Sequence, residues 1–379
     1  MKEKMNSQQP KVIISGGGTG GHIFPAIAIA DGLKRRYPQA DILFIGAKNR
    51  MEMDRVPKAG YPIEGLWISG FKRELSLDNL SFPFKLISSM INARKILKRF
   101  KPDVVIGVGG FASGPTMKTA ASMGIPIVIQ EQNSYPGITN KIVAKKASKI
   151  CVAYDNMEQW FPKDKIVLTG NPLRNNIVPM NDRKDEGVRC FDLNPEKKTI
   201  LLVGGSQGAL GINKGISAQL ASFKENDYQM IWQTGNHYYD KAVKEVEENG
   251  LQYRIKCTVF IDRMDLAYAA ADVVISRAGA MSISELSLLN KAVVFVPLPT
   301  AAEPTERPET GIACCFSVSS WPSPYTSRNF RMAERLPPTP IRTPAPPKVN
   351  ATGSHISIKG MILISCSVSL LLTPFATAI

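Results

Sequence analysis

The stretch KVIISGGGTGGHIFPAIAIADGL (residues 11–33) joins a short apolar run, a glycine-rich turn and a helix-like run. Gly16, Gly18 and Gly21 have the G-x-G-x-x-G spacing that follows the first strand of many nucleotide-binding α/β units. His22 lies where the helix would begin. The stretch therefore predicts a strand–turn–helix unit whose turn binds NAD, a nucleoside triphosphate or another phosphate compound.

The same alternation of β-branched runs and helical stretches continues from residue 11 to about 303. Near-continuous apolar strands separated by helices are typical of parallel sheets covered on both faces, so we predict an α/β fold. The segment FPKDKIVLTGNPLRNN (161–176) predicts a domain boundary near 165–175. The expected strands are KVIIS (11–15), DILFIG (41–46), DVVIGVG (103–109) and IPIVIQ (125–130), then TILLVGG (199–205), QMIWQTG (229–235), CTVFID (257–262), DVVISR (272–277) and AVVFVP (292–297).

Four glycine-containing turns follow expected strands, at the sheet edge where open α/β proteins bind ligands. They are GGGTGGH (16–22), GVGGFASGP (107–115), GGSQGA (204–209) and SRAGAMSISE (276–285). A purely structural role is the alternative, because tight strand-to-helix turns need glycine in any such fold. The chain lacks a Walker G-K-[ST] ending and an acidic residue after the second strand, which leaves a nucleotide sugar as the best-fitting ligand.

Composition narrows the class of protein further. Lys and Arg number 47 against 32 Asp and Glu, and the net charge of +15 favours an anionic partner: a phosphorylated ligand, a nucleic acid or an acidic membrane surface. The six cysteines are scattered without a C-x-x-C pair, which fits neither a zinc site nor a disulfide framework. The N-terminal MKEKMNSQQP (1–10) has no long apolar segment, so we expect no signal peptide and a cytoplasmic chain.

Six motifs in one order point to a known family. They are GGGTGGHIFPA (16–26), GVGGFASGP (107–115), EQNSYPGITNK (131–141), GNPLR (170–174), GGSQGA (204–209) and SRAGAMSISE (276–285). Through them, residues 11 to about 303 closely resemble the bacterial undecaprenyl-diphospho-muramoylpentapeptide β-N-acetylglucosaminyltransferases of glycosyltransferase family 28. The resemblance implies a GT-B fold, with a Rossmann-like acceptor and membrane domain (1–170) facing an incomplete Rossmann-like donor domain (171–303).

The resemblance also implies a reaction and its partners. GlcNAc would pass from UDP-GlcNAc, with inversion, to the C4 hydroxyl of MurNAc in undecaprenyl-diphospho-MurNAc-pentapeptide (lipid I), giving lipid II for peptidoglycan. The resemblance implies a reaction without a metal, and the absence of an Asp-x-Asp motif from the chain agrees with this. We expect no cofactor and no nucleic-acid partner. The expected location is peripheral, at the cytoplasmic face of the cell membrane.

Donor contacts carry over motif by motif. The resemblance implies that Ile261 faces the uracil, that residues 280–285 cradle the diphosphate and that Glu285 holds the ribose hydroxyls. The residue types agree for this last segment, because Ser282 and Ser284 begin an expected helix whose N–H groups can bind phosphate. The full set implied to bind UDP-GlcNAc is Thr19, Gly20, Gly21, Asn133, Arg174, Ser206, Ile261, Ala280, Met281, Ser282, Ile283, Ser284 and Glu285.

The transfer needs a base that removes the proton of the acceptor hydroxyl. His22 is one of three histidines and lies at a cleft turn, and an imidazole is a base suited to neutral pH. A role for His22 in capping the helix or orienting a carboxylate is the alternative. Glu131 is the rival base.

The segment 82–101 is a candidate membrane contact. A basic amphipathic helix can lie on anionic lipid, whereas an ordinary surface helix with a solvated charged face is the alternative. Its apolar residues Phe84, Ile87, Ile91 and Leu97 are interleaved with the basic residues Lys85, Arg94, Lys95, Lys98, Arg99 and Lys101.

The chain changes character after FVPLPTAAE (295–303), where the family pattern stops. The proline-rich 304–379 cannot continue central strands or helices, so we expect it to be largely disordered and the second domain to be marginal. A reading-frame shift near codon 304 is the simplest account, and a genuine different C-terminus is the other. The apolar MILISCSVSLLLTPFATAI (361–379) reaches the length of a minimal membrane span but contains serines and a proline.

Three functions stay open from sequence. The first is the glycosyltransferase, whose activity this chain would largely lose with its C-terminal part. The second is a UDP-GlcNAc 2-epimerase-like enzyme, which shares the fold. The third is a truncated, non-catalytic product.

Overall fold

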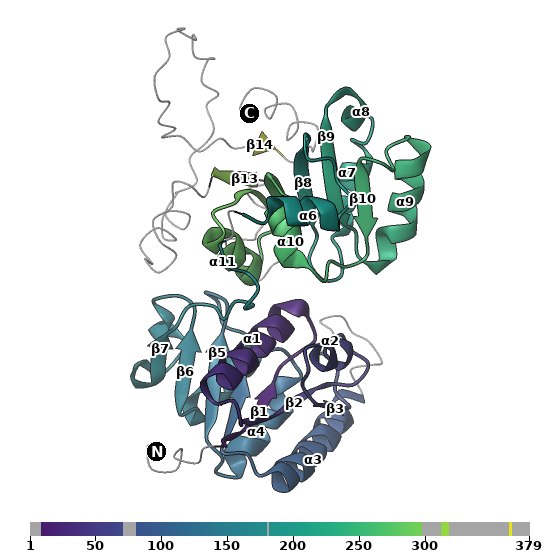
Figure 1. Cartoon of the computed structure of the whole chain (residues 1–379). Helices are drawn as coiled ribbons and strands as arrows, with labels where there is room; N and C mark the ends of the chain where they lie inside the picture. The colour runs from purple at the N-terminus through teal and green to yellow at the C-terminus, as the bar shows by residue number, and fades with distance from the viewer. Residues whose placement is uncertain (1–8, 71–80, 180–181, 298–311, 318–363, 366–379) are drawn as a thin grey trace, which may run out of the picture.

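The computed structural model describes residues 9–70, 81–179, 182–297, 312–317 and 364–365 (Figure 1). These residues form two α/β domains, one built on each half of the chain, and each domain has a central sheet with helices on both faces. The predicted α/β class and its parallel sheets are therefore confirmed for the main body of the chain.

The first domain has a seven-stranded sheet in the order β3-β2-β1-β4-β5-β6-β7, in which every pair is parallel. Successive residues of β1 face opposite sides: Ile13 joins the core under α3 and α4, and Ile14 joins the core under α1 and α2. The elements are β1 (Lys11–Ser15), α1 (Gly20–Arg36), β2 (Asp41–Ala47), α2 (Glu52–Lys58), β3 (Ile63–Leu66), α3 (Phe82–Phe100), β4 (Val104–Gly107), α4 (Ser113–Ser122), β5 (Ile127–Glu131), α5 (Ile138–Val143), β6 (Lys149–Val152) and β7 (Ile166–Leu168).

The second domain repeats this plan, with the strand order β10-β9-β8-β11-β12-β13-β14. One core lies under α7 and α9 and the other under α6, α10 and α11. Its elements are α6 (Lys184–Cys190), β8 (Lys198–Val203), α7 (Leu210–Ser217), α8 (Ser222–Glu225), β9 (Tyr228–Gln233), α9 (Tyr239–Glu248), β10 (Ile255–Thr258), α10 (Met264–Ala270), β11 (Val273–Arg277), α11 (Ala280–Leu288), β12 (Ala292–Val296), β13 (Ile312–Ser317) and β14 (Ile364–Ser365).

Strand order places the ligand site. In the first domain β1 lies between β2 and β4, and in the second domain β8 lies between β9 and β11. The connections leave to opposite faces at these points, which opens a crevice beyond the carboxyl ends of the strands. The two domains lie next to each other (Figure 1), and residues of both line one cavity.

Several strand predictions need correction. The three strands β3, β6 and β7 were not predicted, and the strand expected at CTVFID lies earlier, at Ile255–Thr258. The segment 304–379, for which no strand was expected, contains β13 and β14, and β13 pairs antiparallel with β12. Its sequence IACCFS is short and apolar, which suits the edge of the sheet beside AVVFV. The rest of this segment, including the apolar end at 361–379, lies outside the described residues.

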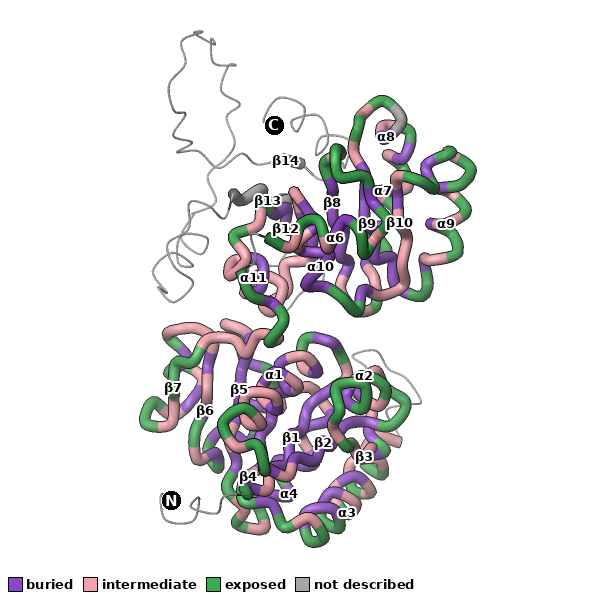
Figure 2. The backbone as a smooth tube through the Cα atoms, viewed as in Figure 1, coloured by how far each residue is buried: buried purple, intermediate pink, exposed green. Residues whose placement is uncertain are grey.

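Helix α3 carries the predicted amphipathic segment but not in the predicted form. Phe84, Ile87 and Ile91 are exposed by 71%, 59% and 52%. Leu97 is buried in the core of the first domain, so its inclusion among the apolar residues of the membrane contact was wrong. Figure 2 shows that α3 has both buried and exposed positions along its length. Within the described part of the chain, no helix is both long and apolar enough to cross a bilayer.

Candidate active site

One cavity of about 1770 Å³ lies between the two domains and is lined by both. The N-terminal turns or preceding loops of α1 and α4 in the first domain and of α7 and α11 in the second are among the segments that line it. None of these helices has an acidic residue in its first turn. Backbone N–H groups at helix starts attract anions, so the cavity suits a ligand with several phosphate oxygens.

The side chain of Glu52 in α2 stabilises the first glycine turn by hydrogen bonds. Sequence reasoning did not identify this residue. Its buried carboxylate accepts hydrogen bonds from the N–H groups of Gly18 (3.1 Å) and Ala47 (3.0 Å). Gly17 has φ +156°, and a Cβ there would lie 2.2 Å from Glu52 Oε1. The turn therefore needs glycine for the carboxylate to reach it.

The second glycine turn touches the first. Gly110 has φ +78°, and a Cβ at this position would lie 2.2 Å from the carbonyl oxygen of Gly17. A Cβ at Gly109, where φ is +89°, would lie 3.1 Å from His22 Cε1. The two turns thus form one surface, and the imidazole of His22 lies against it.

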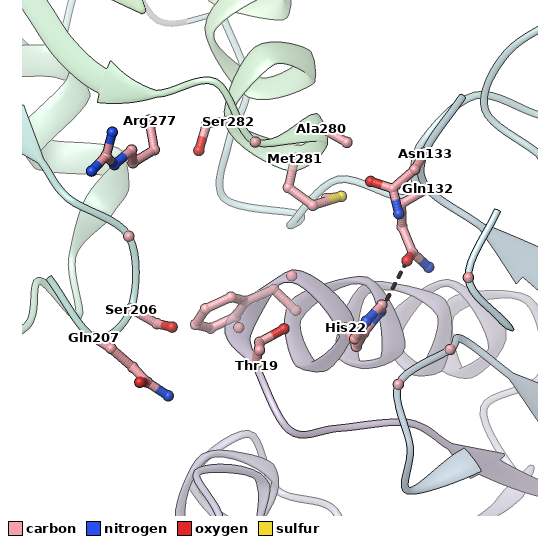
Figure 3. Close-up of a pocket in the computed structure, with 18 of the residues that line it drawn as sticks. Thr19, His22, Gln132, Asn133, Ser206, Gln207, Arg277, Ala280, Met281 and Ser282 are labelled. Carbon is pink, nitrogen blue, oxygen red and sulfur yellow. Dashed lines mark hydrogen bonds between the residues drawn. The ribbon is translucent and has the colours of Figure 1, made fainter. Parts of the chain in front are cut away.

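His22 of α1 contacts Gln132, which follows β5. The distance from His22 Nδ1 to Gln132 Oε1 is 3.0 Å, and Gln132 Nε2 donates to the carbonyl oxygen of Val108 at 3.0 Å. Figure 3 shows His22 and Gln132 at one end of the cavity, with Arg277, Ser206 and Gln207 towards the other. The imidazole is half-buried and lines the cavity, so it can reach a bound ligand.

Glu131 is fully engaged within the protein. One oxygen accepts from the backbone N–H and the side-chain amide of Asn133 (3.1 and 3.0 Å). The other accepts from the N–H of Gly137 (3.1 Å) and from Asn140 Nδ2 (2.8 Å). The side chain is 1% exposed. With four donors around it, Glu131 organises the loop from 133 to 140.

The second domain contributes a buried ionic cluster. Arg174 makes a bidentate ion pair with Glu285 (2.9 and 2.8 Å), and the hydroxyl of Tyr268 donates to the same carboxylate (3.1 Å). Burial lowers the pKa of Arg174, but Glu285 outweighs this effect and holds it above its ordinary value. Burial and Glu285 together raise the pKa of Tyr268. Arg174 also lies over the ring of Phe24 in the first domain, 5.0 Å from its centroid.

Further contacts join the domains beside the cavity. Asn171 donates to the carbonyl oxygen of Gln132 (3.2 Å) and to Ser284 Oγ (3.0 Å), so it links the two halves. Arg55 pairs with Asp262 and lies over the ring of Phe260, 3.9 Å from its centroid.

Most predicted site residues lie together around this cavity. Those that line it are Thr19, Gly20, Gly21, His22, Glu131, Asn133, Arg174, Ser206, Ala280, Met281, Ser282 and Glu285.

Ile261, Ile283 and Ser284 do not line the cavity. The side chain of Ile261 is packed in the domain core, and the neighbouring Phe260 lines the cavity instead. Ser284 lies one helical turn into α11 and donates to the carbonyl oxygen of Ala280 (2.9 Å), while it accepts from Asn171. The predicted donor contacts of these residues stay predictions.

Sequence reasoning missed several lining residues. Gln132 lies inside the motif EQNSYPGITNK and Arg277 inside SRAGAMSISE. Arg277 could have been identified, because a basic residue shortly before a helix start favours binding of an anion. Arg277 is anchored by donating to the carbonyl oxygens of Val296 (3.3 Å) and Pro297 (2.6 Å). Tyr268 and Phe24 gave no signal, because an aromatic residue inside a helical pattern reads as ordinary core.

Sequence comparison now places the chain among known proteins. The Glycosyltransferase family 28 N-terminal domain matches residues 12–152, and the Glycosyltransferase family 28 C-terminal domain matches residues 199–306. The UDP-N-acetylglucosamine–N-acetylmuramyl-(pentapeptide) pyrophosphoryl-undecaprenol N-acetylglucosamine transferase of Parabacteroides distasonis is 57% identical over 296 residues, 77% of this chain and 79% of that protein. The chain belongs to the MurG family of glycosyltransferases. The resemblance drawn from the six motifs is confirmed.

Solved structures agree on the fold. MurG of Acinetobacter baumannii superposes with a TM-score of 0.57 at 28% identity, covering 85% of this chain and 90% of that one, which confirms the GT-B architecture. A UDP-GlcNAc 2-epimerase of Neisseria meningitidis bound to UDP-GlcNAc gives a TM-score of 0.52 at 16% identity, covering 78% and 84% of the two chains. That likeness reaches the fold alone.

Proposed function

We propose that this MurG-family chain transfers GlcNAc from UDP-GlcNAc to the C4 hydroxyl of MurNAc in lipid I, giving lipid II for peptidoglycan. The observation that carries the proposal is the 57% identity over 296 residues to a transferase of that name, together with the family 28 domains that match residues 12–152 and 199–306. The name of that relative gives UDP-GlcNAc as the donor and the undecaprenol-linked muramyl pentapeptide as the acceptor. The starts of α1, α4, α7 and α11 at the cavity support a ligand with diphosphate groups.

The donor would bind mainly against the second domain. The start of α11 and Arg277 offer N–H groups and a positive charge for the diphosphate. Glu285 would hold the ribose hydroxyls, after exchanging part of its contact with Arg174 for them. Ser206, Gln207 and Phe260 lie on the same side and would complete the nucleotide site.

The reaction would be a direct displacement at the anomeric carbon. The acceptor C4 oxygen forms the new bond, its proton passes to His22 Nε2, and the bond from C1 to the β-phosphate oxygen breaks with its electron pair leaving on UDP. The helix start at α11 and Arg277 would stabilise the charge that develops on the departing diphosphate. Glu131 is the weaker candidate for the base, because four protein donors already occupy its carboxylate.

Helix α3 supports a membrane-bound acceptor. Its exposed Phe84, Ile87 and Ile91 form an apolar face, and Phe82 and Leu86 of the same helix line the cavity. An acceptor headgroup could thus occupy the cavity while its lipid stays in the bilayer. We propose a peripheral position at the cytoplasmic face of the membrane, with the basic residues of α3 near anionic headgroups.

The test is a transfer assay with UDP-GlcNAc and a lipid I analogue. We would assay the 379-residue chain beside a chimera in which the corresponding segment of the Parabacteroides distasonis relative replaces residues 304–379. We expect the chimera to form a disaccharide product and UDP in equal amounts, and only with acceptor present.

Each alternative predicts a different result. Formation of an epimerised sugar without acceptor would favour the epimerase. No product from either protein would contradict the proposed transfer. Product from the chimera alone would support the hypothesis that residues 304–379 do not replace the family's C-terminal part. Equal activity of the two proteins would overturn that hypothesis.

A further inference from the structure

We propose that Gln132 is a positioning residue that fixes the neutral His22 ring in the tautomer with its proton on Nδ1. The lone pair of Nε2 then faces the cavity as the proton acceptor. This inference rests on the proposed role of His22 as the base. It assigns to Gln132 the task of keeping His22 Nε2 a proton acceptor rather than a hydrogen-bond donor.

The orientation of the Gln132 amide is set by its own surroundings. Its Nε2 lies 3.0 Å from the carbonyl oxygen of Val108 and 3.4 Å from that of Gln130, and both can only accept. The side-chain oxygen of Gln130 also accepts from this nitrogen. A reversed amide would place oxygen against oxygen in a buried site. The oxygen of the Gln132 amide must therefore face His22.

The amide orientation decides the tautomer of the imidazole. Gln132 Oε1 can only accept, and it lies 3.0 Å from His22 Nδ1. A neutral ring satisfies this contact only with its proton on Nδ1, which leaves a lone pair on Nε2. The hydrogen-bond partner of one ring nitrogen thus sets the state of the other.

The ring also has little freedom to turn away. The turn at Gly109 and Gly110 lies against the imidazole, and a Cβ at either glycine would lie 3.1 Å from a ring atom. In the described part of the chain, no protein group hydrogen-bonds to His22 Nε2. The side of the ring opposite Gln132 is therefore the one left for a ligand.

Two roles of Gln132 have to be separated by experiment. Its backbone carbonyl oxygen accepts from Asn171, so the residue also takes part in the link between the domains. Replacing only the side chain, in Gln132→Met, keeps the backbone and similar volume but removes the acceptor for Nδ1–H. Gln229→Met is the matched control, because Gln229 is a buried glutamine of β9 that joins loops of the second domain away from the cavity.

The first measurement is ¹⁵N NMR of the full chain with labelled histidine, at a pH where the rings are neutral. The chain has three histidines, and a His22→Ala spectrum assigns the signal. We expect the Nδ1–H pattern for His22 in the parent and in Gln229→Met, and a mixed or Nε2–H pattern in Gln132→Met. An Nε2–H pattern in the parent, or an unchanged pattern in Gln132→Met, would overturn the proposal.

A kinetic cycle tests whether the tautomer matters for transfer. In the assay described above, Gln132→Met should lower kcat by about tenfold or more, with donor KM changed by less than about threefold. In a His22→Ala background it should lower kcat no further, since both changes remove the same base. A full additional loss in that background would show that Gln132 acts otherwise. The NMR result stands without turnover, so failure of the proposed function and failure of this inference are distinguishable.

Discussion

The two walls of the cavity are stabilised in different ways. On the first-domain side, buried Glu52, Glu131 and Gln132 accept from or donate to the loops themselves, so the loops are fixed without any ligand. On the second-domain side, Arg174 and Glu285 satisfy each other, with Tyr268 as a third partner. The first wall is preorganised, whereas the second has polar groups that a ligand must share or displace.

This difference predicts a division of labour. Fixed groups suit catalysis, because a base and the helix starts around it need no rearrangement at the moment of reaction. Paired groups suit recognition, because ribose hydroxyls can donate hydrogen bonds to the Glu285 carboxylate while Arg174 stays close enough to balance its buried charge. Substitutions of His22 and Gln132 in the first wall should change kcat, and substitutions of Arg174 and Glu285 in the second should change donor affinity and stability.

The largest expected effect is at His22. His22→Ala should lower kcat by about 10²-fold or more and change donor KM less, because it removes the base but no proposed donor contact. Steady-state transfer kinetics measure both parameters, in the chain itself or in the chimera described above. His237→Ala is the control, since His237 is an exposed histidine of the second domain. A kcat for His22→Ala within a few-fold of the parent would exclude His22 as the base.

Arg174→Met should affect recognition and stability together. It leaves Glu285, 6% exposed in its side chain, without its cation, which costs about 3 kcal/mol of the free energy of unfolding. Donor KM should rise by about tenfold, a binding loss of about 1.4 kcal/mol. Urea unfolding and donor titration measure these effects. Lys197→Met breaks a pair with Asp227, whose side chain is 77% exposed, and should cost less than about 1 kcal/mol. An equal loss in both variants would contradict the comparison.

A smaller effect is expected on the outer surface of the first domain. Replacing Phe84, Ile87 and Ile91 together by serine should weaken binding to anionic lipid vesicles by about tenfold, because their exposed side chains would no longer enter the interface. Vesicle sedimentation measures the bound fraction. Serine at Leu210 and Tyr253, exposed apolar residues of the second domain, is the control. Equal binding of the α3 variant and the parent would exclude this face as the membrane contact.

The smallest expected effect is on acid stability in the second domain. Burial raises the pKa of Asp272, but hydrogen bonds from Lys184 and the N–H of Thr199 outweigh it and hold the pKa below its ordinary value. The folded state therefore favours the charged form. Its contribution is present above about pH 4 and is lost as the pH falls through the lower folded pKa. Asp272→Asn should reduce the fall in Tm between pH 6 and pH 3 by a few degrees at most; an unchanged fall would contradict this role.

The sequence predicted the main fold because its strongest signals are local. Apolar strands such as KVIIS and TILLVGG each end in a glycine turn, and that combination specifies a strand–turn–helix unit without knowledge of the rest of the chain. The strands β3, β6 and β7 were missed for the same reason. They have only four, four and three residues, and β3 contains a glutamate and a glycine, so their pairing depends on neighbours that a local pattern does not include.

The site was predictable in outline and not in its contacts. Motifs placed His22, Arg174 and Glu285 near one another, but not the pairing of Arg174 with Glu285, because that pair joins side chains 111 residues apart. The role of Glu52 was hidden in the same way, since its partners become visible only when α2 packs beneath the glycine turn. Leu97 was misassigned because a stripe read along the sequence does not show which side of the helix meets the sheet.

Calorimetric titration of UDP into His22→Ala and Arg174→Met, beside the parent chain, tests the division of labour between the two walls most directly. The account predicts that His22→Ala binds UDP within about twofold of the parent and that Arg174→Met binds it about tenfold more weakly. Loss of UDP affinity in His22→Ala as large as in Arg174→Met would contradict it, because the wall assigned to catalysis would then also hold the nucleotide.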